Sequence, residues 1–164
     1  MNHVVLASAS RPRAQIMTQM GLQFTQHPTM VPEDLDPCLF TTCEEYCDAT
    51  CRLKCDSIIT SDDTVYVTAD TVVIVNDGCK DILLEKPKDY EDARRMLMLY
   101  VEYKGARVYK SVCVRRGDIV VQRGRTTVIS FRPNLTNRDI DTFLNTHYDT
   151  IKNGSGALVV LGPT

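Results

Sequence analysis

The chain has 164 residues, of which 43% are hydrophobic and 24% charged, and its formal net charge is -2. This length and composition are typical of one folded globular domain, which we expect to span residues 1–164. The balanced charge gives no basic surface for nucleic acid, and no apolar run resembles a membrane span or a signal peptide. We therefore expect a cytoplasmic protein with no nucleic-acid and no membrane partner.

The N-terminal segment predicts a strand, a turn rich in small hydroxyl residues, and then a helix. The strand covers His3–Leu6, and Gly21 closes the helix. Free N–H groups at a helix N-terminus, with serines and arginines beside them, make a good anion site. The alternative is that Ser10 only caps the helix and that Arg11 and Arg13 are solvated.

A second strand is predicted over residues 24–31, and an acidic loop follows it. The loop carries Glu33, Asp34 and Asp36 between two prolines. Three carboxylates at this spacing form either a solvated turn or part of a cation site.

A helix that begins at Thr41 or Thr42 carries a stripe of cysteines, at Cys43, Cys47, Cys51 and Cys55. Residues four apart lie on one helix face. The odd number of cysteines in the chain, seven, does not indicate a disulfide framework. A metal or redox site on the stripe is one interpretation. Because cysteine packs as a small hydrophobe, we expect reduced, buried thiols.

Residues 68–75 predict a buried strand, because they are mostly β-branched and apolar. Asp70 lies within this run. A buried carboxylate is costly unless it is paired, protonated or bound to metal. Asp70 therefore has either a structural partner or a role in function.

The second half of the chain predicts strands at 108–114, 119–121 and 126–131. Helices are predicted from residue 90 to about 100 and from 137 to about 145, with Thr136 as the N-cap of the second. Interleaved strands and helices predict an α/β fold, in which a mixed twisted sheet is flanked by helices.

Several short segments together resemble the Maf (septum formation inhibitor) family. They occur in the family's order and at similar spacing: Leu6-Ala7-Ser8-x-Ser10 followed by arginines, Ala69-Asp70-Thr71-Val72-Val73, Glu85-Lys86-Pro87-x-Asp89, Phe131-Arg132-Pro133, and Gly154-Ser155-Gly156-Ala157. Members are nucleoside triphosphate pyrophosphatases that cut between the α and β phosphates. The resemblance implies an elongated, ITPase-like fold with a central cleft, often in a homodimer. It also implies Mg²⁺ or Mn²⁺ and a house-cleaning role in nucleotide metabolism or an influence on septum formation.

The resemblance also assigns roles to individual residues. Asp70 would ligate the cation or activate the attacking water, while Lys54 and Lys86 would neutralise charge on the leaving pyrophosphate. Threonine at Thr71 resembles the subgroup that prefers dTTP and UTP. The remaining residues implied to bind substrate are Ser8, Ser10, Arg11, Arg13 and Gly156.

The sequence departs from the family pattern at four places, one of which is Lys104-Gly105-Ala106-Arg107-Val108, where the histidine of the family's segment is missing. Arg11 and Pro12 stand in exchanged order, and Pro37 stands where we expect a metal-binding glutamate, which leaves Asp34 and Asp36 as substitutes. The chain also ends before the family's closing strand and helix. A catalytically weak relative that binds nucleotides or a protein partner is therefore the alternative.

Overall fold

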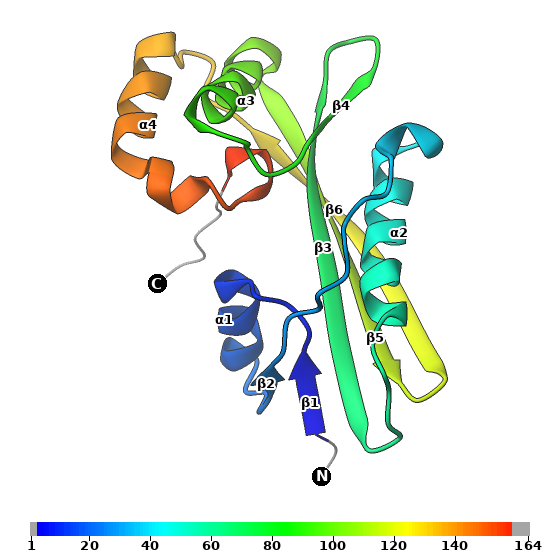
Figure 1. Cartoon of the computed structure of the whole chain (residues 1–164). Coiled ribbons are helices and arrows are strands. Elements are labelled where there is room, and N and C mark those ends of the chain that lie inside the picture. The colour runs from blue at the N-terminus through cyan, green and yellow to red at the C-terminus, as the bar shows by residue number, and fades with distance from the viewer. Residues whose placement is uncertain (1–2, 159–164) are drawn as a thin grey trace. The chain divides into compact units, whose positions relative to one another are not determined.

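The computed structural model describes residues 3–158. Its elements follow the chain as β1 (His3–Leu6), α1 (Arg11–Gln19), β2 (Thr25–Gln26), η1 (Pro37–Leu39), α2 (Cys43–Asp56), β3 (Thr64–Asn76), β4 (Asp81–Leu84), α3 (Tyr90–Tyr103), β5 (Gly105–Arg116), β6 (Ile119–Ser130), α4 (Asn137–Ile151) and η2 (Ser155–Ala157) (Figure 1). The predicted mixed α/β fold is confirmed. Over the described residues, six strands form one sheet in the order β2-β1-β3-β5-β6, with β4 paired to β3.

The chain divides into two compact units. Unit 1 comprises Met1–Asp70 and Lys110–Arg125, and unit 2 comprises Thr71–Tyr109 and Thr126–Thr164. Strands β3, β5 and β6 contribute residues to both units. The expectation of a single domain stays a prediction.

In unit 1, β1 lies between two parallel neighbours, since Val5 pairs with Thr25 of β2 and with Tyr66 of β3. Helix α2 begins after Thr42, whose side chain accepts a hydrogen bond from the Glu45 N–H. This N-cap confirms the predicted start of the helix.

Three of the four cysteines of the α2 stripe form a packing face, as expected, whereas Cys43 at the start of the helix is only partly buried. Cys47, Cys51 and Cys55 have no exposed surface, and the last two pack with Cys113 of β5. All seven cysteines are free thiols. The stripe holds α2 against the sheet through close packing of small side chains.

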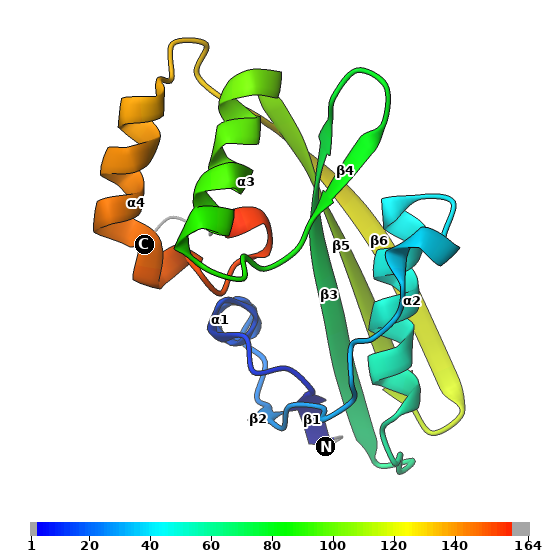
Figure 2. The same cartoon turned by 45° about the horizontal axis from the view of Figure 1, so that its top comes forward.

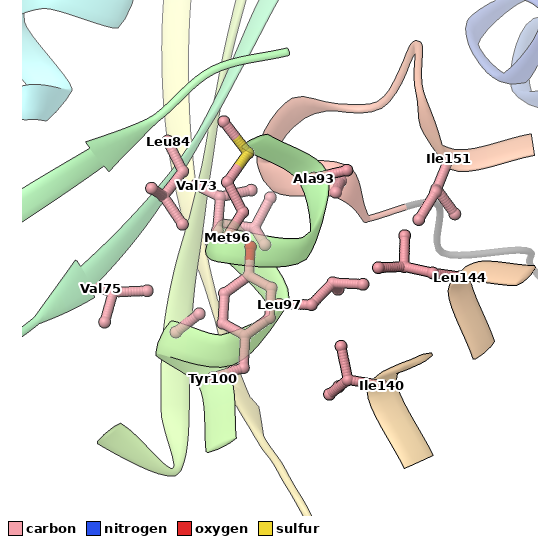
Figure 3. Packing of buried hydrophobic residues seen from close by; sticks show 13 residues of the cluster. Val73, Val75, Leu84, Ala93, Met96, Leu97, Tyr100, Ile140, Leu144 and Ile151 are labelled. Carbon is pink, nitrogen blue, oxygen red and sulfur yellow. The ribbon is translucent and has the colours of Figure 1, made fainter. Parts of the chain in front are cut away.

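Unit 2 is built around helices α3 and α4, which lie side by side (Figure 2). Asp89 caps α3, and Thr136 and Asp139 form a capping box at the start of α4. Met96, Leu97 and Tyr100 of α3 meet Ile140 and Leu144 of α4 in a buried cluster that also includes Val73 and Val75 of β3 (Figure 3).

Several predicted element boundaries were wrong, and β3 and β5 are longer than the strands predicted at 68–75 and 108–114. The strand expected at 24–31 is only Thr25–Gln26, because Pro28 has no N–H to donate to a ladder. The strands expected at 119–121 and 126–131 are one strand, β6. The polar residues between them are tolerated because β6 is an edge strand and Arg123, Gly124 and Arg125 are exposed. Helix α4 continues beyond residue 145 to Ile151.

Across residues 3–158, no helix has both the length and the apolarity that crossing a bilayer requires.

Candidate functional site

The N-terminus of α1 follows directly from the end of β1. Ser10 takes the N-cap position, but its side chain makes no capping hydrogen bond. The structure therefore does not show the capping role that was the alternative for Ser10. The N–H groups of the first helical turn have no side-chain cap from this residue, which favours an anion site at this end.

Arg13 connects α1 to β3 through hydrogen bonds. Its Nη1 donates to Ser8 Oγ at 3.0 Å and to the Ala69 carbonyl oxygen at 2.8 Å. The arginine and the serine therefore lie beside the residue that precedes Asp70. Arg11 is exposed on the first turn of the same helix.

Asp70 lies in β3 with 8% of its surface exposed, and its two oxygens meet two donors from α2. Lys54 Nζ donates to Asp70 Oδ1 at 2.7 Å, and Cys47 Sγ donates to Oδ2 at 3.5 Å. Lys54 and Cys47 are seven residues apart, so two helical turns place them on one face. Both of these donors therefore come from a single helix.

Lys54 has a second carboxylate partner, Glu33, whose Oε1 lies 3.1 Å from Nζ. The resemblance to the Maf family predicts Asp34 and Asp36, not Glu33, as cation ligands in this loop. Asp36 instead accepts a hydrogen bond from the Cys38 N–H and caps η1, and Asp34 is exposed. Three nearby carboxylates look alike in the sequence, and only the path of the loop brings one of them to Lys54.

Burial dominates the electrostatics of the cysteines near this group. Burial first, and then the charge of Asp70, raises the pKa of the Cys47 thiol far above its ordinary value. Burial likewise raises the pKa of Cys51, although hydrogen bonds with Ser111 and Thr68 oppose the shift. The thiol at Cys47 is therefore a protonated donor toward Asp70 at neutral pH.

The other predicted site residues, Lys86, Thr71 and Gly156, belong to unit 2. Lys86 is exposed just after β4, and the Thr71 carbonyl oxygen accepts a hydrogen bond from Ser155 Oγ at 2.7 Å. The Gly156 N–H donates to the Glu85 carbonyl, and its own carbonyl accepts from Tyr100 Oη at 2.6 Å. Both polar groups of Gly156 are thus used within unit 2, and its predicted contact with substrate stays a prediction.

Within the part of the chain that the structure describes, no group of three or more His, Cys, Asp or Glu side chains is arranged to hold a metal ion. The carboxylates closest to such a role are Asp70 and Glu33, which share Lys54. Mg²⁺ at phosphate-processing sites is commonly held by one or two carboxylates together with phosphates and water. The donor set of Asp70 and Glu33 fits that pattern and does not fit an all-protein cage.

The fold is similar to the structure of the Staphylococcus aureus Ham1 protein, with a TM-score of 0.50 and 12% identity over 80% of this chain and 72% of that chain. This likeness concerns the fold alone.

Among named proteins, the chain is 31% identical to a "dTTP/UTP pyrophosphatase" of Vibrio parahaemolyticus, over 97% of this chain and 81% of the relative. It is 29% identical to a protein of the same name from Pseudoalteromonas atlantica, with the same coverage.

A relative in Homo sapiens, named "Probable bifunctional dTTP/UTP pyrophosphatase/methyltransferase protein", is 37% identical over 57% of this chain and 16% of its own length. The model of the Maf-like protein family matches residues 3–162, nearly the whole sequence. The chain therefore belongs to the Maf family.

Proposed function

We propose that this chain hydrolyses nucleoside triphosphates at the α–β phosphoanhydride, giving the nucleoside monophosphate and pyrophosphate, with dTTP and UTP as preferred substrates. The family and its named members make the chain a hydrolase that acts on acid anhydrides. The observation that carries the proposal is the Lys54–Asp70 pair, which is buried in unit 1 beside the helix end held by Arg13.

The side chains of unit 1 supply the parts that such a reaction needs. Ser8, Arg13 and the first turn of α1 provide donors for phosphate oxygens. Lys54 is a point charge that offsets negative charge developing between the phosphates. Asp70 accepts the proton of the water that attacks the α phosphorus, while the bond from that phosphorus to the bridging oxygen breaks and pyrophosphate leaves.

A divalent cation, Mg²⁺ or Mn²⁺, is part of the proposal. Asp70 and Glu33 are the residues that would hold it, together with the phosphates of the substrate. Such a cation supplies charge neutralisation and polarises the phosphoryl oxygens. Asp34 and Asp36 remain predicted ligands that no contact with Asp70 or Lys54 supports.

The finer assignments come from the resemblance and from the names of relatives. Thr71 and those names favour a thymine or uracil base. The roles of Lys86, Thr71 and Gly156 toward the same substrate stay predictions. So do a cytoplasmic location, a homodimer, and a part in house-cleaning or septum formation.

The test is pyrophosphate release from dTTP, UTP, CTP, GTP, 7-methyl-GTP and inosine triphosphate, each with Mg²⁺, with Mn²⁺ and with a chelator. We expect metal-dependent release that is fastest with dTTP or UTP and is lost in Asp70→Asn. The matched control is Asp141→Asn, which breaks the surface ion pair with Arg94 in unit 2 and should leave the rate unchanged.

Two results would contradict the proposal. Release that continues unchanged in Asp70→Asn would exclude the assigned role of Asp70. A folded chain that gains thermal stability with nucleotide but releases no pyrophosphate would instead support the alternative, a relative that binds nucleotides without turnover.

A further inference from the structure

The thiol of Cys47 lies against the second oxygen of the proposed catalytic carboxylate. We propose that Cys47 is a positioning residue: it holds Asp70 Oδ2 while Lys54 holds Oδ1, so that one face of α2 fixes the plane of the carboxylate. This inference rests on the proposed function for its effect on the rate, but the contact itself is independent of any activity.

Cys47 and Lys54 together form a clamp on the Asp70 carboxylate, and both residues lie on a helix that is itself fixed to the sheet. Cys47 and Lys54 lie two turns apart on α2, and the Thr42 cap and the buried Cys51 and Cys55 fix that helix on the sheet. Gln122 of β6 adds a hydrogen bond from its side-chain amide to the Asp48 carbonyl at 2.8 Å. Two donors on one rigid element hold a carboxylate more firmly than donors on separate loops would.

Burial increases the contribution of the hydrogen bond from the Cys47 thiol to Asp70. A thiol is a poor hydrogen-bond donor in water, but Cys47 has no exposed surface and Asp70 has only 8%. In such surroundings water competes little for Oδ2, and a carboxylate oxygen left without a donor costs free energy. An apolar residue at position 47 would leave Oδ2 without this donor.

The competing explanation is that Cys47 only fills space in the stripe. Its neighbour Cys51 provides the comparison, because it is one turn away, is equally buried, and meets the backbone oxygens of Thr68 and Ser111. Truncation of either cysteine removes the same atoms from the same packing face. Only truncation of Cys47 removes the thiol that meets Asp70 Oδ2.

The first experiment compares Cys47→Ala with Cys51→Ala under saturating and limiting dTTP and Mg²⁺. We expect Cys47→Ala to lower kcat by about three- to tenfold, with KM changed by less than about twofold, because one modest hydrogen bond to the reacting group is lost. Cys51→Ala should keep the kcat of the unchanged chain. Cys47→Ser should recover part of the loss, because its hydroxyl restores a donor, whereas Cys47→Val fills the space without one.

The second experiment observes the contact without turnover. The S–H stretching band of Cys47 reports its hydrogen bond. This band is isolated as the infrared difference between the wild-type protein and Cys47→Ala. We expect this band at a lower wavenumber than that of a free thiol, and at a higher wavenumber in Lys54→Met/Asp70→Leu. The double variant removes the acceptor without leaving an unpaired ammonium.

The outcomes separate the inference from the proposed function. Equal losses of kcat in Cys47→Ala and Cys51→Ala, or no recovery in Cys47→Ser, would reduce Cys47 to packing and overturn the inference. An infrared band that does not respond to Lys54→Met/Asp70→Leu would also overturn it. If the unchanged chain releases no pyrophosphate from any nucleotide, the proposed function fails, and the infrared band alone decides whether the clamp exists.

Discussion

Lys54 donates to Asp70 across 2.7 Å, and the two side chains lie inside unit 1 with 10% and 12% of their surface exposed. An ion pair at this depth costs desolvation on both sides and is retained only if each partner keeps the other satisfied. The pair therefore has measurable consequences for folding as well as for the proposed chemistry.

Removing one partner of this pair should destabilise the chain. Lys54→Met leaves the Asp70 carboxylate without its cation, and we expect a loss of about 3 kcal/mol in the free energy of unfolding, measured in urea. Lys54→Met/Asp70→Leu should recover part of the loss, because no buried charge remains. The control is Arg52→Met on the same helix, whose pair with Asp56 is about half exposed and contributes little. Similar losses in Lys54→Met and Arg52→Met would show that the pair is not buried in solution.

Arg13 should matter more for substrate affinity than Arg11. Arg13→Lys keeps the positive charge but replaces the guanidinium, whose Nη1 donates to both Ser8 and the Ala69 carbonyl, with a single ammonium nitrogen, which leaves fewer donors for phosphate oxygens. We expect KM for dTTP to rise about tenfold, as for the loss of a charged hydrogen bond. Arg11→Lys, at an exposed position, should give a smaller rise. A larger rise in KM for Arg11→Lys than for Arg13→Lys would contradict the prediction and would assign the phosphate contact to Arg11.

Gly156 should tolerate no side chain. Its φ is +64°, and a Cβ there would meet Tyr100 Oη and would lie 2.8 Å from Val73 Cβ. We expect Gly156→Ala to lower the free energy of unfolding by about 2–4 kcal/mol through strain and overpacking. Gly78→Ala is the matched control, because Gly78 also has a positive φ but has no atom within 4 Å of its Cβ position. It should cost only about 1 kcal/mol, and an equal cost at both positions would exclude overpacking at Gly156.

The exposed and the buried thiols should react at different rates with an aromatic disulfide reagent, and the partly exposed Cys43 should fall between them. Cys38 and Cys79 are exposed and should react at once in the folded chain, whereas the buried Cys47, Cys51, Cys55 and Cys113 should react only after unfolding. Burial also raises the pKa of Cys113 to about 12, which keeps this thiol protonated and unreactive at neutral pH. Fast labelling of more than one thiol per chain in Cys38→Ser/Cys79→Ser, beyond the partly exposed Cys43, would show that the buried part of the stripe opens in solution.

Much of this protein was determined by local sequence. The start of α2 at Thr42, the capping box at Thr136 and the cysteine stripe follow from short-range rules, because caps and helix faces depend on residues within one or two turns. The sequence also marks Asp70 as unusual, because a carboxylate in an apolar strand needs a partner. The resemblance to the Maf family was also readable from short segments.

Tertiary structure decided which groups meet. Lys54 reaches Asp70 from another element, and Glu33 rather than Asp34 or Asp36 reaches Lys54, because the path of an acidic loop over a fold has no local signature. Cys47 and Cys51 are equivalent in the sequence, yet only the placement of α2 against β3 sets one of their thiols on Asp70 Oδ2. The sequence determines which side chains a helix presents on one face, but long-range packing determines what that face touches.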